Sequence, residues 1–298
     1  MCGLLLINKP AEITSFGAVA KIRKLTGEKH IGHAGTLDPM ASGVLPVLLG
    51  RATKLCGRML CADKTYKATV RLGVLTDTLD ITGRVLESKP VSVTNSMIDE
   101  ALSGFLGETY QVPPMFSAIK KDGVRLYRLA RQGKTVDLPS RKVTVFSISR
   151  TSDINENFEF DFTCTVSKGT YIRALSRDIG NALGTPATLT ALCRTETAGF
   201  KIDECVELGK LNLENVNSYI LPASRAVEGF RKVAVTRPQA IRFSNGGALS
   251  FDRLPEKDYL SGETVGIYLC DEFIGLATAD DAGGQLKFDC LINDLKGE

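Results

Sequence analysis

This sequence has very few histidines, and it lacks zinc-type cysteine spacings and long apolar runs. Its only two histidines, His30 and His33, are three residues apart, and no nearby cysteine or glutamate completes a metal-ligand set around them. None of the eight cysteines forms a C-x-x-C pair, which argues against structural zinc and fits a reduced, cytosolic protein. Two histidines without a G-x-S-x-G motif also argue against a Ser-His-Asp hydrolase.

Membrane and nucleotide signals are missing as well. No stretch approaches the ~20 apolar residues of a membrane-spanning helix. The first apolar run, Leu4–Ile7, is too short for the core of a signal peptide. Neither a G-x-G-x-x-G nor a Walker A motif is present, so a nucleotide cofactor has no support. We therefore expect a cytoplasmic protein without metal, cofactor or membrane association.

Charge is distributed unevenly along the 298 residues. The stretch from Asp252 to Glu298 has eleven acidic and four basic residues, a net charge of −7. Since the whole chain carries +3, residues 1–251 carry a net charge of +10. A basic body suits an anionic partner, whereas the plainer interpretation is a solvated, solubilising surface. The 43% of hydrophobic residues are enough for a sizeable core.

Hydrophobic periodicity divides the chain into two parts. Up to about Gly229, strand-like alternation is interleaved with helical patterns, whereas beyond Arg231 short β runs separated by glycine-containing turns remain. We predict an α+β domain over residues 1–229 and a small all-β domain, a barrel or sandwich, over 230–298. The expected strands are 3–7, 43–50, 66–72, 83–87, 157–167, 187–197, 232–235, 265–269, 273–279 and 286–291. The expected helices are 14–25, 55–60, 94–106, 124–132 and 171–184.

The segment from Gly32 to Lys54 places a carboxylate on an irregular loop. Asp38 and Pro39 form a turn-favouring dipeptide between a glycine-rich stretch and an apolar strand at 43–50. Functional groups are commonly held on loops that a rigid scaffold positions. The alternative is that Asp38 only caps the turn ahead of Pro39.

Two groups of basic residues indicate an anionic ligand. The segment Lys120–Lys142 contains eight basic and two acidic residues, with Tyr127 among the arginines of its predicted helix. Basic residues with an interleaved aromatic suit a nucleic-acid backbone and its bases, although a solvated basic helix face is an equally good explanation. Arg173 lies in the first turn of a predicted helix, where a cation opposes the helix dipole unless an anion is close.

Six collinear motifs cover essentially the first 200 residues. They are Gly32-His33-Ala34-Gly35-Thr36-Leu37-Asp38-Pro39 with its continuation at Ser42–Pro46, Gly50–Lys54, Asp63–Tyr66, Thr76–Thr78, Pro114–Ala118 and Ser167–Arg173. Together these motifs resemble the TruB family, the bacterial tRNA pseudouridine-55 synthases.

The resemblance implies a role for each matching residue. Asp38 matches the catalytic aspartate, a nucleophile, and Arg173 the arginine that pairs with it. Tyr66 matches the tyrosine that stacks on the target base and is placed for proton abstraction. The remaining substrate contacts implied are His33, which helps hold the flipped-out T-loop, Tyr171, a second base-contacting tyrosine, and Leu192, which packs under the target nucleotide.

The resemblance also implies the fold, the reaction and the partner. The expected fold is a pseudouridine synthase catalytic domain, a mixed and largely antiparallel sheet with flanking helices. An RNA-clamping insertion is expected at about 110–142, and a PUA-like C-terminal domain at 230–298. The expected reaction converts uridine to pseudouridine at position 55 in the T-loop of tRNA by base flipping, without a cofactor. The partner would be the T-arm of tRNA, bound by a monomer with no obligate protein partner.

Two other functions are compatible with these residues. One is a catalytic subunit that needs a guide RNA and protein partners, which the compact length, basic insertion and acidic tail disfavour. The other is a tRNA-binding folding helper whose chemistry is incidental or lost. The presence of Asp38, Tyr66 and Arg173 argues against loss of the chemistry but not against an additional folding role.

Overall fold

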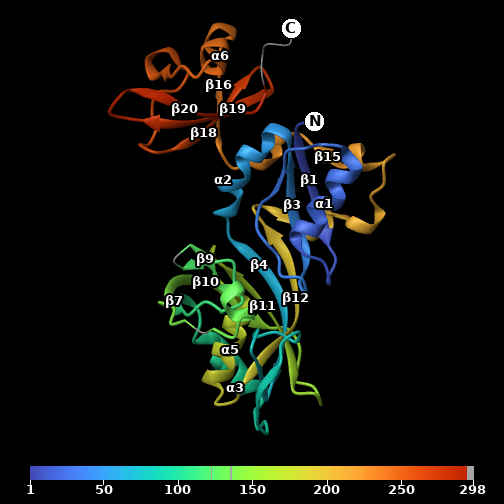
Figure 1. Cartoon of the computed structure of the whole chain (residues 1–298). Coiled ribbons are helices and arrows are strands. Elements are labelled where there is room, and N and C mark those ends of the chain that lie inside the picture. Colours follow the sequence, from blue (N-terminus) through green and yellow to red (C-terminus); the bar gives the residue numbers. More distant parts are fainter. Residues whose placement is uncertain (122, 135, 294–298) are drawn as a thin grey trace.

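The computed structural model describes residues 1–121, 123–134 and 136–293. Figure 1 shows an elongated molecule in which the C-terminal β structure lies at one end, beside the first strand and α2. Asp122, one of the two acidic residues counted in the basic segment, and residues 294–298 of the predicted C-terminal domain lie outside the described residues.

One mixed sheet of eleven strands organises the larger part of the molecule. Its main path runs β14-β1-β3-β12-β4-β11-β10-β7, with β2, β13 and β15 paired to its members. Among the described strands, the β1–β14 and β3–β12 pairs are parallel and the other pairs of this sheet antiparallel, which confirms the predicted mixed, largely antiparallel sheet. The strands are β1 (Gly3–Lys9), β2 (Ile31–His33), β3 (Ser42–Leu49), β4 (Lys64–Leu72), β7 (Gly107–Gln111), β10 (Arg141–Arg150), β11 (Glu159–Val166), β12 (Ala187–Thr197), β13 (Phe200–Lys201), β14 (Val206–Glu207) and β15 (Ile220–Leu221).

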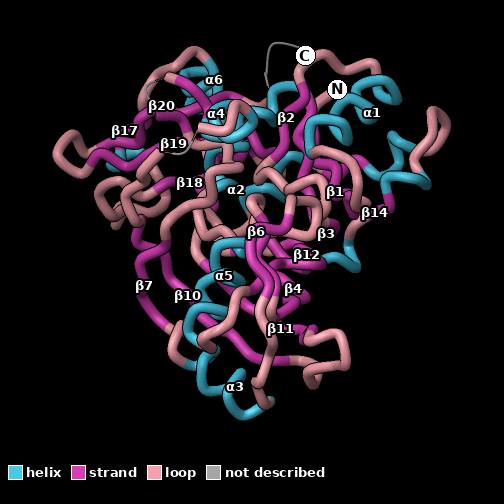
Figure 2. Tube along the Cα trace, turned by 60° about the horizontal axis from the view of Figure 1, so that its bottom comes forward, coloured by secondary structure: helices cyan, strands magenta, loops and turns pink. Residues whose placement is uncertain are grey.

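Helices cover this sheet, and the two ends of α1 follow ordinary capping rules. In α1 the Thr14 side chain accepts a hydrogen bond from the amide of Gly17, and Gly27 ends the helix in the left-handed conformation. In Figure 2, α5 and α3 lie one below the other beside β10 and β11. The helices of this part are α1 (Ser15–Thr26), α2 (Cys56–Leu60), α3 (Asn95–Ser103), α4 (Leu126–Arg131) and α5 (Ile172–Ala182), with 3-10 turns η1 (Gly50–Leu55), η2 (Ile202–Glu204), η3 (Leu208–Lys210), η4 (Val216–Tyr219) and η5 (Ala223–Val227).

The apolar run of β1 is buried on both faces of the sheet. Leu5 and Ile7 belong to the core that also contains Ile22 of α1. Leu4 and Leu6 belong to a second core on the opposite face, shared with the C-terminal β structure. Strands covered on both sides read as continuous hydrophobic runs, which is why this segment shows no alternation.

The C-terminal part is a five-stranded sheet in the order β16-β18-β19-β20-β17, with its own core. Its elements are β16 (Arg231–Ala234), β17 (Leu249–Ser250), β18 (Thr264–Leu269), β19 (Glu272–Asp280), β20 (Gln285–Leu291), η6 (Phe251–Arg253) and one helix, α6 (Arg237–Ser244). The predicted small β domain is confirmed, but α6 was not foreseen. This helix is only eight residues long and buries just Ala240 and Phe243, too few positions for a clear helical period.

Three other predicted elements need correction. The helix expected over 94–106 ends at Ser103, followed by a turn into β7. The strand expected at 83–87 is β6 (Val85–Ser88), which pairs with β5 (Val74–Thr76) in a separate hairpin. The helix expected over 124–132 begins at Leu126, because the two preceding residues form β9 (Val124–Arg125), paired with β8 (Lys120–Lys121).

Gly43, at the start of β3, leads to a first testable prediction. Its φ is +108°, and a Cβ there would lie 2.2 Å from the carbonyl oxygen of Arg194 on β12. Gly43→Ala should lower the free energy of unfolding by more than 2 kcal/mol, about the cost of forcing two strand backbones apart. The matched control is Gly184→Ala, where φ is +70° but nothing lies within 4 Å of the added methyl group. Equal losses in urea unfolding would show that the close strand contact contributes nothing.

Candidate active site

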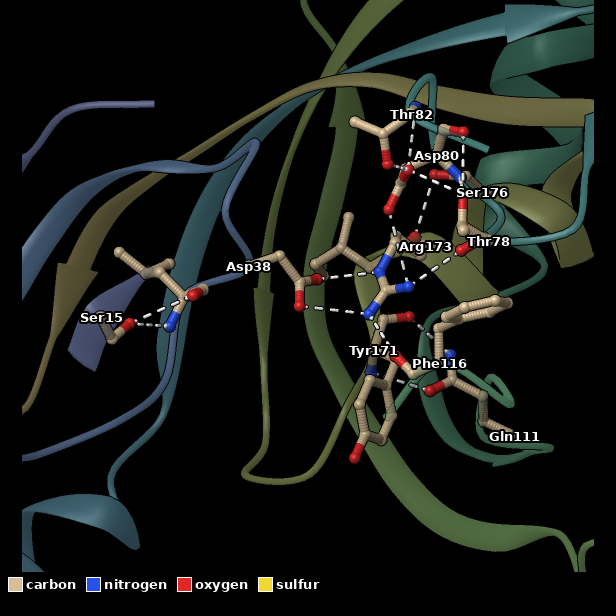
Figure 3. A network of polar contacts seen from close by, with 12 residues as sticks. Ser15, Asp38, Thr78, Asp80, Thr82, Gln111, Phe116, Tyr171, Arg173 and Ser176 are labelled. Atoms are coloured by element: carbon tan, nitrogen blue, oxygen red, sulfur yellow. Dashed lines mark hydrogen bonds and ion pairs between the residues drawn. The ribbon is translucent and has the colours of Figure 1, made fainter. Parts of the chain in front are cut away.

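The carboxylate of Asp38 lies directly against the guanidinium of Arg173. Arg173 Nε donates to Oδ2 at 2.8 Å and Nη2 donates to Oδ1 at 3.1 Å, a bidentate pair (Figure 3). Arg173 is buried, with 5% of its side chain exposed, whereas 35% of the Asp38 side chain remains exposed. The arginine therefore fixes the direction of a carboxylate that a substrate can still reach.

Arg173 also donates hydrogen bonds to two other loops. Its Nη1 donates to the carbonyl of Thr78 at 2.9 Å, and its Nη2 donates to the carbonyl of Phe116 at 2.9 Å. These residues belong to the segments after β5 and after β7, which are far apart in the sequence from each other and from Asp38. A buried guanidinium is costly unless its N–H groups have hydrogen-bond acceptors. These bonds supply the acceptors and hold three motif loops around one cation.

A second carboxylate, Asp80, faces the same guanidinium and was not predicted. Its Oδ2 lies 3.6 Å from Arg173 Nη1, and only 7% of its side chain is exposed. Its Oδ1 accepts hydrogen bonds from the hydroxyl of Thr78 at 2.8 Å and from the amide of Thr82 at 3.0 Å. Residues 76–80 are mostly polar and have no helical or strand period, and nothing local to them shows that this segment folds back onto α5.

Two buried side chains tie down the loop that holds Asp38. Lys9, at the end of β1, is fully buried, and its ammonium donates to the carbonyls of Pro10, Ile13 and Pro39 at 2.8, 2.8 and 3.4 Å. Burial lowers the pKa of Lys9 to about 8. The hydroxyl of Ser15 donates to the carbonyl of Leu37 and accepts from its amide. Both sides of Asp38 are thus held, and neither anchor was predicted.

Tyr66 and Leu192 lie on two neighbouring strands of the sheet. Leu192 of β12 is opposite Ala68 of β4, and Arg194 is opposite Tyr66, which places these side chains on one face. Tyr66 is 7% exposed and Leu192 8% exposed, and both belong to the same core as Leu37. Burial raises the pKa of Tyr66, and the nearby Arg194 guanidinium opposes that shift.

Tyr171 sits at the N-terminal cap of α5, two residues before Arg173. The buried side chain of Gln111 holds its backbone at both groups, because Nε2 donates to the Tyr171 carbonyl at 3.2 Å and Oε1 accepts from the Tyr171 amide at 2.9 Å. Burial raises the pKa of the half-buried Tyr171. The ring is drawn on the side of the Asp38–Arg173 pair nearest Phe116 (Figure 3).

His33 is on β2, opposite Val47 of β3. It is half-buried, and its Nδ1 is shielded from solvent without a hydrogen-bond partner in the described part of the chain. Burial lowers the pKa of His33 below its usual 6.5. The imidazole is therefore neutral at pH 7.

The two histidines give a prediction for pH dependence. Since the folded-state pKa of His33 lies below the unfolded value, the unfolded chain binds a proton first as the pH falls through about 6.5. The free energy of unfolding should therefore drop below that pH more steeply in the wild type than in His33→Gln. His30→Gln is the control, because 83% of the His30 side chain is exposed. Identical pH dependence in the wild type and His33→Gln, measured by urea unfolding between pH 7.5 and 5.5, would contradict this.

The basic segment is folded as a small hairpin followed by α4. Tyr127 lies among arginines, with Arg131 positioned over its ring at 5.7 Å. Contacts with Arg128 and Arg125 lower the pKa of the Tyr127 hydroxyl. Nearer the Asp38 site, Arg141, Lys142 and Lys168 line a cavity of about 330 Å³ together with Tyr171. Cations therefore border one side of the site.

These groups make a site suited to covalent or acid–base chemistry at an oriented carboxylate, beside aromatic and apolar side chains that can receive a flat ring. No group of three or more metal-ligating side chains occurs among the residues placed by the structure. In the same residues, no helix is long and apolar enough to cross a membrane.

Comparison with known proteins gives a consistent result. Residues 23–172 match the family described as "TruB family pseudouridylate synthase (N terminal domain)". The chain is similar to tRNA pseudouridine synthase B of Clostridium tetani, at 39% identity over 96% of this chain and 98% of that protein. The corresponding protein of Clostridium novyi is 40% identical over 96% and 99%, and that of Nitrosococcus oceani 40% identical over 87% and 85%.

Solved structures agree with this match. A chain from "a Cbf5-Nop10-Gar1 Complex" has a TM-score of 0.78 and 27% identity, covering 99% of this chain and 86% of that one. A chain from an "H/ACA RNP bound to a substrate RNA containing 2'-deoxyuridine" has a TM-score of 0.75 and 26% identity, covering 98% and 85%. Both likenesses extend over the eleven-stranded sheet and the C-terminal β structure alike.

Proposed function

Because this chain belongs to the TruB family of pseudouridylate synthases, which are isomerases, we propose that it converts uridine to pseudouridine at position 55 in the T-loop of tRNA. The observation that carries the proposal is the bidentate Asp38–Arg173 pair at the meeting point of three loops, in which the arginine is buried and 35% of the Asp38 side chain is exposed. The reaction breaks the N1–C1′ bond and joins C5 to C1′, so that the uracil leaves and returns within one site. C5 loses its hydrogen as a proton and N1 takes up a proton, so nothing is oxidised or reduced. Asp38 acts as the nucleophile, and Arg173 holds its carboxylate in a fixed orientation.

The target base has to leave its stack before Asp38 can reach it. We propose that the nucleotide flips into the space beside Asp38, where Tyr66 stacks on the base, Tyr171 contacts it and Leu192 packs beneath it. The burial of Tyr66 and Leu192 on one sheet face supports this arrangement, because a rigid wall can receive a flat ring. His33, neutral at pH 7, helps hold the flipped-out conformation of the T-loop.

Binding of the T-arm would use the basic segment and the C-terminal domain. We propose that residues 110–142 form an insertion within a catalytic domain of residues 1–229, and that its arginines close over the RNA backbone. The domain at 230–298 is PUA-like and adds contacts without dominating affinity, given its acidic balance. The shared core of the two parts and the contact of Arg58 with Asp289 at 2.6 Å support a fixed spacing between them.

The enzyme is proposed to act as a cytoplasmic monomer without a protein partner or cofactor. Incubating the purified chain with an unmodified tRNA transcript, followed by pseudouridine mapping through carbodiimide modification and primer extension, tests both substrate position and independence. We expect one stop, at position 55, which disappears when that uridine is replaced by cytidine. Modification that requires an added guide RNA or protein would favour the partner-dependent alternative.

A further inference from the structure

Arg194, on β12, is fully buried and lies behind the Asp38 loop. Among the described residues, it is the largest side chain that is fully buried. Its Nε donates to the carbonyl of Val44 at 2.9 Å and its Nη2 donates to the carbonyl of Gly35 at 3.0 Å. A buried guanidinium bonded to backbone carbonyls is costly unless its position serves a purpose, since its charge is not neutralised by those contacts.

Two glycines of the central motif lie against residue 194, Gly35 against the guanidinium and Gly43 against the main chain. Gly35 has φ +108°, and a Cβ there would lie 3.2 Å from Arg194 Nη1 and 3.5 Å from Nη2. Gly43 has the same φ, and its Cβ would lie 2.2 Å from the Arg194 carbonyl oxygen. The Arg194 side chain therefore contacts the loop at both ends, through the carbonyls of Gly35 and Val44, and Asp38 lies between these two contacts.

The same arginine is the cross-strand neighbour of Tyr66. Tyr66 of β4 is directly opposite Arg194 of β12. Two other titratable groups, Cys164, which is its neighbour on β11, and Asp38, raise the pKa of the Tyr66 hydroxyl through their charge. One buried side chain thus joins the loop of the proposed nucleophile to the tyrosine proposed to contact the base.

We propose that Arg194 is a positioning residue of the active site, which sets the distance between the Asp38 loop and Tyr66 from behind. This inference rests on the proposed function for its effect on rate. Its structural content, that Arg194 clamps the loop from residue 35 to residue 43, stands independently of the reaction. A loop released at either end would leave Asp38 paired with Arg173 but displaced relative to the base, and a displacement of about 1 Å can cost about 100-fold in rate.

The test compares Arg194→Lys and Arg194→Met with the same changes at Arg150. Arg150 is also mostly buried and also joins separate segments, through Asp99 of α3 and Asp153, but it does not contact the loop. At saturating tRNA transcript, the single-turnover rate constant should fall about 100-fold in Arg194→Met and about 10-fold in Arg194→Lys, which keeps the charge but not the fork. The dissociation constant for tRNA should stay within about twofold, because Arg194 is shielded from RNA. The Arg150 variants should melt at lower temperature with unchanged rate constants.

A readout independent of catalysis completes the test. Hydrogen–deuterium exchange of the peptide spanning residues 34–43 should accelerate in Arg194→Lys and not in Arg150→Lys. If Arg194→Met does not fold, Gly35→Ala serves instead, with Gly199→Ala, where φ is +80° and nothing lies within 4 Å, as its control. Unchanged loop exchange, or rate constants within twofold of wild type in both Arg194→Lys and Gly35→Ala, would overturn the proposal. If the wild type itself forms no pseudouridine, the proposed function fails and the exchange result alone decides the role of Arg194.

Discussion

Replacing Asp38 by alanine is expected to abolish pseudouridine formation and to leave tRNA binding nearly intact. Loss of a nucleophile removes the reaction path itself, so the rate constant should fall by at least about 10⁴-fold. Binding should change by less than about threefold, because the cations that would hold the RNA backbone, Arg141, Lys142 and Lys168, line a cavity to which Asp38 does not contribute. Pseudouridine content of nuclease-digested tRNA, separated by chromatography, measures the first quantity, and filter binding the second.

Two further variants make the Asp38 result specific. Asp38→Asn keeps the shape of the side chain and should be as inactive as Asp38→Ala, since an amide is a poor nucleophile. Asp161→Asn is the matched control, because that carboxylate on β11 also pairs with a cation, Lys67, at 3.2 Å, but belongs to another part of the sheet. Its activity should equal that of the wild type. An active Asp38→Asn enzyme, or a strong loss of tRNA binding in Asp38→Ala, would remove Asp38 from its proposed role.

The second large effect is expected at Arg173, and it combines stability with activity. Arg173→Met leaves Asp80, the carbonyl of Thr78 and the carbonyl of Phe116 without their buried donor. Removing one member of a buried ion pair typically costs about 3–5 kcal/mol, and the orientation of Asp38 is lost at the same time. We expect the free energy of unfolding to fall by about that amount and the rate constant by at least about 10³-fold.

Arg177→Met is the control on the same helix. Arg177 pairs with Asp178 at 2.8 Å, but 23% of its side chain is exposed. Partly exposed pairs contribute about 0–1 kcal/mol, so this variant should remain close to wild type in urea unfolding and in activity. Similar losses in the Arg173 and Arg177 variants would mean that any charge change in α5 is harmful and that the convergence of loops on Arg173 has no special weight.

The sequence predicted elements whose signals are local. The helix expected over 14–25 is present as α1, and the strand expected over 66–72 is present within β4, because both signals depend on neighbours within a few residues. The Asp38–Pro39 turn is likewise present, with the amide of Ala41 donating to the Asp38 carbonyl.

What the sequence did not reveal depends on tertiary contact. Asp80, Lys9 and Arg194 are charged residues in stretches that look like a loop or strand ends, and only the folded sheet shows that they are buried around the Asp38 loop. Strand pairing had the same limit, because nothing in the residues of β6 shows that it pairs with β5 outside the main sheet. A buried charge leaves no periodic trace in a sequence, since its partners come from segments far away in the chain.

The measurement that tests the central claim most directly is tritium release from a tRNA transcript labelled at uridine C5, using the purified chain alone. Isomerisation joins C5 to C1′ and expels the hydrogen from C5, so each turnover releases one label into water. We predict release that approaches one equivalent per tRNA with the wild type and background release with Asp38→Ala. Tight binding of the transcript without release by the wild type would contradict the account and leave a tRNA-binding protein without isomerase activity of its own.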